Sequence, residues 1–143
     1  MADISIRPFR EGDLAALAAL LGELGYPTTV DQMRARLDRI ARHPDHATFV
    51  AVADGCVVGL TGAYVTPSYE HDEPTGRLTA VVVSGEARGL GIGRRLIAAA
   101  EAWTRQRGAR VMMLTSHNRR EAAHAFYRHL GYDETGRRFV RTL

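Results

Sequence analysis

One stretch of the sequence combines residue types and spacing that could bind an anion. It reads Arg88-Gly89-Leu90-Gly91-Ile92-Gly93, and its alternating glycines bring backbone N–H groups together with few Cβ atoms between them. Three consecutive valines before it are typical of a buried strand, and the apolar residues after it recur at helical spacing. The first N–H groups of such a helix lack partners within the helix, and the helix dipole adds positive charge. We therefore expect a phosphate group to bind at this loop, beside Arg88, Arg94 and Arg95.

Other phosphate-binding loops fit this stretch less well. A Walker loop needs a lysine followed by serine or threonine, whereas Arg94 and Arg95 follow these glycines. A Rossmann fingerprint has the spacing G-x-G-x-x-G near the start of a βαβ unit, but these glycines alternate and their strand lies past the middle of the chain. In a purely structural alternative the glycines only let the helix pack tightly on the strand. The flanking strand and helix favour phosphate binding over that alternative.

Two stretches of the sequence together resemble conserved motifs of a known family. Arg88-x-x-Gly91-x-Gly93 resembles the pyrophosphate loop of the GNAT superfamily of acyl-CoA-dependent N-acyltransferases, whose pattern is Gln/Arg-x-x-Gly-x-Gly/Ala. Further along, Asn118, the pair Phe126-Tyr127 and the pair Gly131-Tyr132 resemble the second conserved block of that superfamily. Two independent motifs in the right order are far more specific than either motif alone. The resemblance covers nearly the whole chain and is strongest over residues 80–132.

The resemblance implies acetyl-CoA as the cosubstrate and gives roles to individual residues. Tyr127 would protonate the departing CoA thiolate as the general acid, a role that a phenol can fill. Asn118 would hydrogen-bond the pantetheine arm, and Phe126 would pack against it. Backbone groups of the strand before the loop would pair with pantetheine and polarise the acetyl carbonyl. The cofactor-binding residues implied in this way are Val81, Val82, Val83, Arg88, Gly89, Leu90, Gly91, Ile92, Gly93, Arg94, Asn118 and Phe126.

These residues also have structural alternatives. Tyr127 could be an ordinary residue of an amphipathic helix, although its neighbours already fill the apolar face. Asn118 could be a plain N-cap because Glu121 follows it at capping-box spacing, and one arrangement of the side chain could serve both roles. The valines 81–83 could simply belong to the core.

The general base is left open by the sequence, although the acceptor amine must lose a proton before it attacks. Some members of the superfamily place a glutamate on the strand before the loop, but residues 77–83 contain no carboxylate. A water relay is one alternative. Another is an acidic loop, which could bind a cationic amine or be a solvated loop tip, and its residues are Glu70, His71, Asp72 and Glu73. His117 is a weaker candidate for the base. Cys56 is not expected to act as an acylated nucleophile, because it follows a turn glycine and has no activating partner nearby in the sequence. No His, Cys or carboxylate cluster has metal-ligand spacing.

The rest of the pattern predicts one mixed α+β domain over residues 1–143. The chain is 45% apolar and 24% charged, which is ordinary for a globular domain. Asp13 and Thr29 are expected to cap helices, and Asp54-Gly55 to form a hairpin turn. The order of the expected strands and helices along the chain predicts a mostly antiparallel central sheet with helices on both faces, as in the GNAT fold. Strands are expected at 4–9, 48–53, 57–65, 77–83, 111–115 and 138–143, and helices at 14–24, 30–40, 92–107 and 119–130.

We expect an N-acetyltransferase that moves an acetyl group from acetyl-CoA to a small cationic amine by direct attack. Acetylation of a protein N-terminus or lysine, and a CoA-binding module without turnover, stay open as alternatives. The net charge of +3 is scattered and no nucleic-acid motif is present, so a nucleic-acid partner is not expected. Cys56 is the only cysteine and no apolar run reaches membrane-spanning length, which favours a cytoplasmic protein without a membrane partner. A homodimer through the C-terminal strand is left open.

Overall fold

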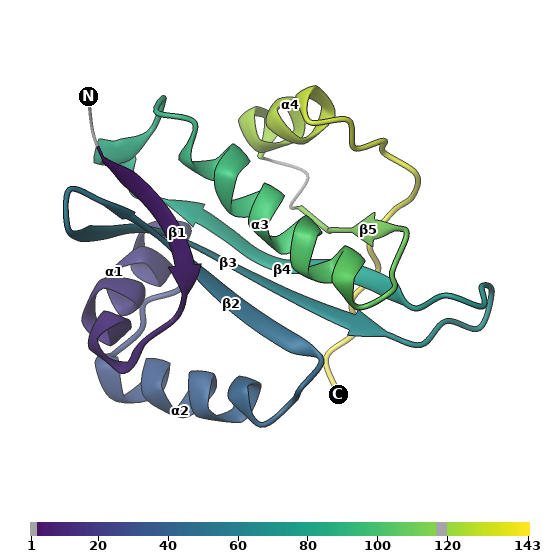
Figure 1. Cartoon of the computed structure of the whole chain (residues 1–143), viewed down its shortest axis with the longest axis horizontal. Coiled ribbons are helices and arrows are strands. Elements are labelled where there is room, and N and C mark those ends of the chain that lie inside the picture. Colours follow the sequence, from purple (N-terminus) through teal and green to yellow (C-terminus); the bar gives the residue numbers. More distant parts are fainter. Residues whose placement is uncertain (1–2, 117–119) are drawn as a thin grey trace. The chain divides into compact units, whose positions relative to one another are not determined.

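The computed structural model describes residues 3–116 and 120–143, and the chain divides into two compact units, 1–113 and 114–143. The first unit contains a five-stranded sheet in the order β1-β2-β3-β4-β5 (Figure 1). Neighbouring strands are antiparallel except for β5, which runs parallel to β4. The strands are β1 (Ile4–Pro8), β2 (His46–Ala53), β3 (Cys56–Thr66), β4 (Thr75–Val83) and β5 (Met112–Met113). The predicted mostly antiparallel α+β architecture is confirmed, while the single domain stays a prediction.

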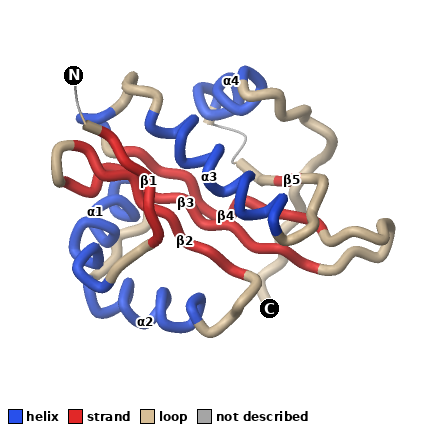
Figure 2. Tube along the Cα trace, viewed as in Figure 1, coloured by secondary structure: helices blue, strands red, loops and turns tan. Residues whose placement is uncertain are grey.

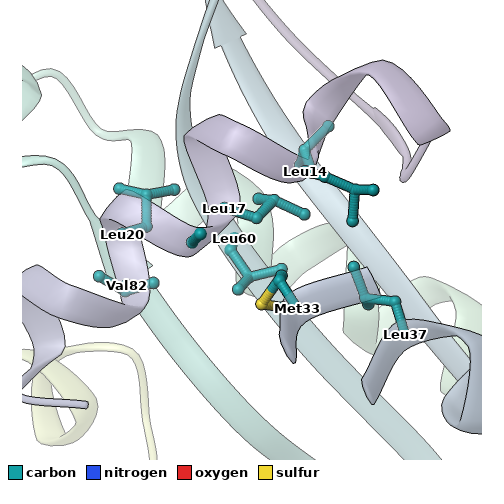
Figure 3. Packing of buried hydrophobic residues seen from close by; sticks show 9 residues of the cluster. Leu14, Leu17, Leu20, Met33, Leu37, Leu60 and Val82 are labelled. Atoms are coloured by element: carbon teal, nitrogen blue, oxygen red, sulfur yellow. The ribbon is translucent and has the colours of Figure 1, made fainter. Parts of the chain in front are cut away.

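Helices cover both faces of this sheet (Figure 2). Val50 and Leu60 pack in one core cluster with α1 (Leu14–Leu24) and α2 (Val30–Ala41), as Figure 3 shows for Leu60. Ala51, next to Val50 along β2, packs instead with α3 (Ile92–Gln106). Because neighbouring residues of a strand point to opposite faces, α1 and α2 lie on one face and α3 lies on the other.

Short-range signals in the sequence set several of the turns and helix ends. Thr29 and Gln32 form the predicted capping box, with hydrogen bonds of 3.0 and 3.1 Å that fix the start of α2. Asp54 and Gly55 form the predicted hairpin turn, with φ angles of 49° and 82°. Asp13 departs from the prediction, because it makes no side-chain cap for α1. Its buried carboxylate instead accepts hydrogen bonds from the guanidinium of Arg7 at 2.8 and 2.9 Å.

The predicted strands near the C-terminus are shorter than expected or missing. Of residues 111–115, only Met112 and Met113 form a strand, and they pair with Gly76 and Arg77 alone. The segment 138–143 is not a strand, and its apolar residues are exposed. Alternating apolar residues give a segment the propensity for a strand, but a strand also needs a backbone edge to pair with. No strand of the described residues pairs with 138–143.

Candidate active site

Strand β4 carries a β-bulge in the middle of its pairing with β3. Ala80 lies opposite Gly62 and Leu78 lies opposite Ala63, which leaves Thr79 without a partner. A Cβ atom at Gly62 would lie 2.5 Å from the Oγ1 atom of Thr79. Only glycine at this position on β3 leaves room for the threonine hydroxyl on the face that α2 covers. A bulge of this kind re-aims side chains and interrupts pairing, which is common beside active sites.

Beyond the bulge, one edge of β4 has no strand beside it among the described residues, because β5 pairs only with Gly76 and Arg77. The N–H of Ser84 donates to the carbonyl of Val58 on β3 at 2.8 Å. Since successive N–H groups of a strand point to alternate edges, those of Val81 and Val83 point away from β3. The backbone of β4 therefore presents two donors on its open edge, whereas the side chain of Val82 is buried in the α1 and α2 core.

The glycine loop follows β4 and leads into α3. Gly89 and Gly91 have φ angles of 83° and 74°, in the left-handed region that glycine alone adopts readily. A Cβ atom added to either residue would meet no atom of the described residues within 4 Å. These glycines are therefore needed for the backbone conformation and not for tight packing of helix on strand. The loop leaves open space around its backbone at the N-terminus of α3, as binding of an anion requires.

Helix α3 is held firmly behind this loop. The side chains of Ile92, Leu96 and Ile97 are buried, which anchors the first turns of the helix on the sheet. Arg88 and Arg94 are exposed beside the loop. Arg95 serves another purpose, because its guanidinium donates to the carbonyl of Ile4 on β1 at 2.9 Å.

The C-terminal unit contains the helix α4 (Glu121–His129), which carries Phe126 and Tyr127. The ring of Tyr127 lies 5.5 Å from the ring of Phe126 and 6.2 Å from that of Tyr132. Burial raises the pKa of the Tyr127 phenol, and the positive charge of Arg120 only partly offsets this effect. The phenol therefore keeps its proton and can donate it. Asn118, the other side chain predicted on this motif, lies outside the described residues, as does His117.

The acidic loop lies at the other end of β4 from the glycine loop. Residues 67–74 connect β3 to the first residue of β4, whereas the glycine loop follows the last residue of β4. The two ends of β4 are roughly 25 Å apart. Glu70, His71 and Asp72 are exposed, and the backbone N–H groups of the first two donate to the hydroxyl of Ser68. Glu73 forms an ion pair with Arg110 at 3.7 Å. The structure therefore does not bring these four residues close to the bulge or to the glycine loop.

A cavity of about 340 Å³ lies between α2 and the sheet, on the face where the bulge points. Its floor crosses three strands at Thr48, at Gly62, which is the register partner of Thr48, and at the bulged residue Thr79. Sequence reasoning missed this cavity, because its shape depends on the bulge. The available signal was a pair of polar residues at inward positions of β2, namely His46 and Thr48.

His46 lines this cavity and has a partly buried imidazole ring. Its ring stacks on Tyr64 with 5.0 Å between the centroids and an angle of 20° between the planes. Its Nδ1 atom is buried and has no hydrogen-bond partner within 3–116 and 120–143. Two effects lower the pKa of the His46 imidazole: desolvation by burial is the larger, and the nearby His43 is the smaller. His46 is therefore neutral at neutral pH, with one unsatisfied ring nitrogen.

Two features are absent from the described part of the chain. No three His, Cys, Asp or Glu residues are arranged to hold a metal ion there. No helix in that part is long and apolar enough to cross a membrane.

Comparisons with known proteins give matches over most of the chain. Residues 14–132 match the acetyltransferase (GNAT) family. An aminoglycoside N(6')-acetyltransferase type 1 of Stenotrophomonas maltophilia is 34% identical over 137 residues, covering 93% of this chain and 88% of that protein. An aminoalkylphosphonate N-acetyltransferase of Salmonella typhimurium is 32% identical over 124 residues, covering 87% and 78%. The aminoglycoside N-acetyltransferase AAC(6')-Iy, solved in complex with CoA, superposes with a TM-score of 0.88 at 24% identity, covering 100% of this chain and 96% of that one.

Proposed function

The chain belongs to the acetyltransferase (GNAT) family and is an acetyl-CoA-dependent N-acetyltransferase, and we propose that it acetylates the primary amine of a small molecule by direct attack on the thioester. The acceptors named for two relatives, aminoglycosides and aminoalkylphosphonates, are both small amines. This supports a small-molecule acceptor over a protein N-terminus or lysine. The cytoplasmic location and the homodimer stay predictions.

The observation that carries the proposal is the order of features along β4. The bulge at Thr79 comes first, then the open-edge donors of Val81 and Val83, and then the glycine loop. A pantetheine chain in extended conformation can pair with such an edge as an added strand would. Its pyrophosphate would then reach the N-terminus of α3, where the N–H groups of the loop and Arg88 and Arg94 favour negative charge.

The proposed residues divide the chemistry between them. The acetyl thioester supplies the electrophilic carbon; a C–N bond forms there and the C–S bond breaks. One N–H group on the open edge of β4 donates to the carbonyl oxygen as negative charge develops on it. Tyr127 donates its proton to the departing sulfur. The proton of the amine passes to water, because β4 offers no carboxylate to accept it.

The structure alters one expectation about the acceptor. The preference for a cationic amine depended on Glu70, Asp72 and Glu73, and these residues lie at the far end of β4 from the glycine loop. The acidic loop therefore does not support that preference, although the aminoglycosides named for one relative are themselves cationic amines. The proposal is therefore limited at this point to a small primary amine.

The test is a panel of primary amines with acetyl-CoA, measured by thiol release and by the mass of the acetylated product. Tyr127→Phe should abolish most of the turnover and keep acetyl-CoA binding, because only the proton donor is removed. Tyr69→Phe is the matched control, because that ring is fully exposed at the hairpin tip. Binding of acetyl-CoA with no acetylated amine from the panel would instead support a CoA-binding module without turnover.

A further inference from the structure

The cavity under α2, which we call the α2 cavity, is too large and too open to be a packing defect. Its volume of about 340 Å³ lies in the range of small-ligand sites, whereas voids in protein cores rarely exceed the size of a water molecule. Thr79 is exposed, so the cavity opens to the surface at the bulge. Thr79 and Ala80 line the cavity and lead directly to Val81, whose N–H lies on the open edge of β4. A ligand in the cavity can therefore present one end close to the proposed acetyl site.

The lining of the α2 cavity is mostly apolar and carries a single formal charge. Leu21, Met33, Leu37 and Ile40 provide apolar walls from the two helices. Among the described residues, Arg36 is the only charged side chain that lines the cavity, and neither Asp nor Glu lines it. A half-buried guanidinium on an apolar surface attracts an anion more strongly than one in water.

Arg36 is held in place but is not neutralised. Its guanidinium donates to the hydroxyl of Thr28 at 3.1 Å, which fixes the side chain against the loop before α2. No carboxylate of the described residues forms an ion pair with it. Other arginines of this region do have such partners; Arg34, two residues earlier, pairs with Glu11 at 3.0 Å. Arg36 can therefore accept a carboxylate or phosphonate from a ligand.

The far end of the cavity fixes the length of the ligand. His46 lies two strands from Thr79 and two residues further along the sheet, which is roughly 12 Å. A molecule that spans this distance has a body of several carbon atoms against the apolar walls.

We propose that the α2 cavity binds the non-reacting part of the acceptor and selects a primary amine with an apolar body and an anionic end group, which Arg36 binds, over a polycationic amine. This inference rests on the proposed acetyltransferase function and names its substrate class. A second ammonium group would be repelled by Arg36 and would find no carboxylate in the cavity.

The test is a matched series of acceptors with the same six-carbon body: aminohexanoate, hexylamine and hexanediamine. The wild-type protein should acetylate aminohexanoate with the highest kcat/KM. Arg36→Gln should lower that value about tenfold, mainly through KM, because a charge-assisted hydrogen bond is lost. The same variant should leave hexylamine nearly unchanged and should not impair hexanediamine.

Arg39→Gln is the matched control, because Arg39 lies on α2, is exposed and does not line the cavity. It should change none of the three values, and melting curves should show that both variants are folded. A wild-type preference for hexanediamine would overturn the inference, and so would an equal loss for all three amines in Arg36→Gln. Those results leave the proposed function intact, whereas failure to acetylate any amine in this series or in the wider panel would overturn both.

Discussion

Replacing Gly91 by alanine tests the glycine loop without disturbing the core. The φ angle of Gly91 is 74°, in the region where a residue with a Cβ atom costs about 1–2 kcal/mol. In the part of the chain that the structure describes, the added Cβ atom would meet nothing within 4 Å. The whole cost is therefore backbone strain, with no contribution from a clash.

That strain divides between stability and binding. If the variant loop keeps its conformation, the free energy of unfolding falls by about 1–2 kcal/mol. The Tm then falls by about 4 °C for each kcal/mol. If the loop relaxes when no ligand is bound, the same free energy is lost from acetyl-CoA binding, where about 1.4 kcal/mol raises the Kd tenfold. The two losses together should come to about 1–2 kcal/mol.

Calorimetric titration with acetyl-CoA and thermal denaturation measure the two parts separately. Gly12→Ala is the matched control, because Gly12 is exposed, has no positive φ angle and has nothing within 4 Å of an added Cβ atom. It should change neither quantity. If Gly91→Ala kept both the wild-type Kd and the wild-type Tm, the loop would not hold the strained conformation from which its role is argued.

Three further predictions concern the proposed general acid Tyr127, the ion pair between Arg7 and Asp13, and the packing of α3 on the sheet. Tyr127→Phe should lower kcat about 100-fold. Because burial raises the pKa of the Tyr127 phenol, the wild-type rate should not fall through loss of the phenol proton below about pH 10. A pH–rate profile checks this. Asp13→Asn should destabilise the fold by about 2 kcal/mol in urea denaturation. The hydrogen bond from Arg7 lowers the pKa of Asp13, so this stabilisation is present above about pH 4 and is lost as the pH falls further through the lowered folded pKa, where the wild type and the variant should converge. Gly76→Ala should cost about 2 kcal/mol, because its Cβ atom would overlap the buried side chain of Thr104 on α3; equal melting temperatures for this variant and the wild type would contradict the packing described.

Features that depend on a few neighbouring residues could be predicted from the sequence. The capping box of Thr29 and Gln32, the turn at Asp54-Gly55 and the loop around Gly91 all depend on local backbone preferences. These preferences are strong, because a left-handed φ angle or an unsatisfied N–H group has a direct cost at one position. The order of strands and helices followed from hydrophobic periodicity in the same way.

Features that depend on a partner strand could not be predicted. Nothing within residues 77–83 indicates that Thr79 is bulged, because the cause lies across the sheet at Gly62. The α2 cavity depends on that bulge and was missed together with His46. The strand expected at 138–143 fails for the same reason, since its alternating pattern says nothing about whether an edge is available to pair with.

The most direct test of the account is calorimetric titration of acetyl-CoA into the wild-type protein, with ATP as the comparison ligand. The proposed site on β4 and the glycine loop predicts saturable binding of one acetyl-CoA per chain and much weaker binding of ATP, which lacks the pantetheine arm that would pair with β4. The absence of saturable acetyl-CoA binding would contradict the account, because the roles proposed for the open edge of β4, for Tyr127 and for the α2 cavity all depend on that cosubstrate.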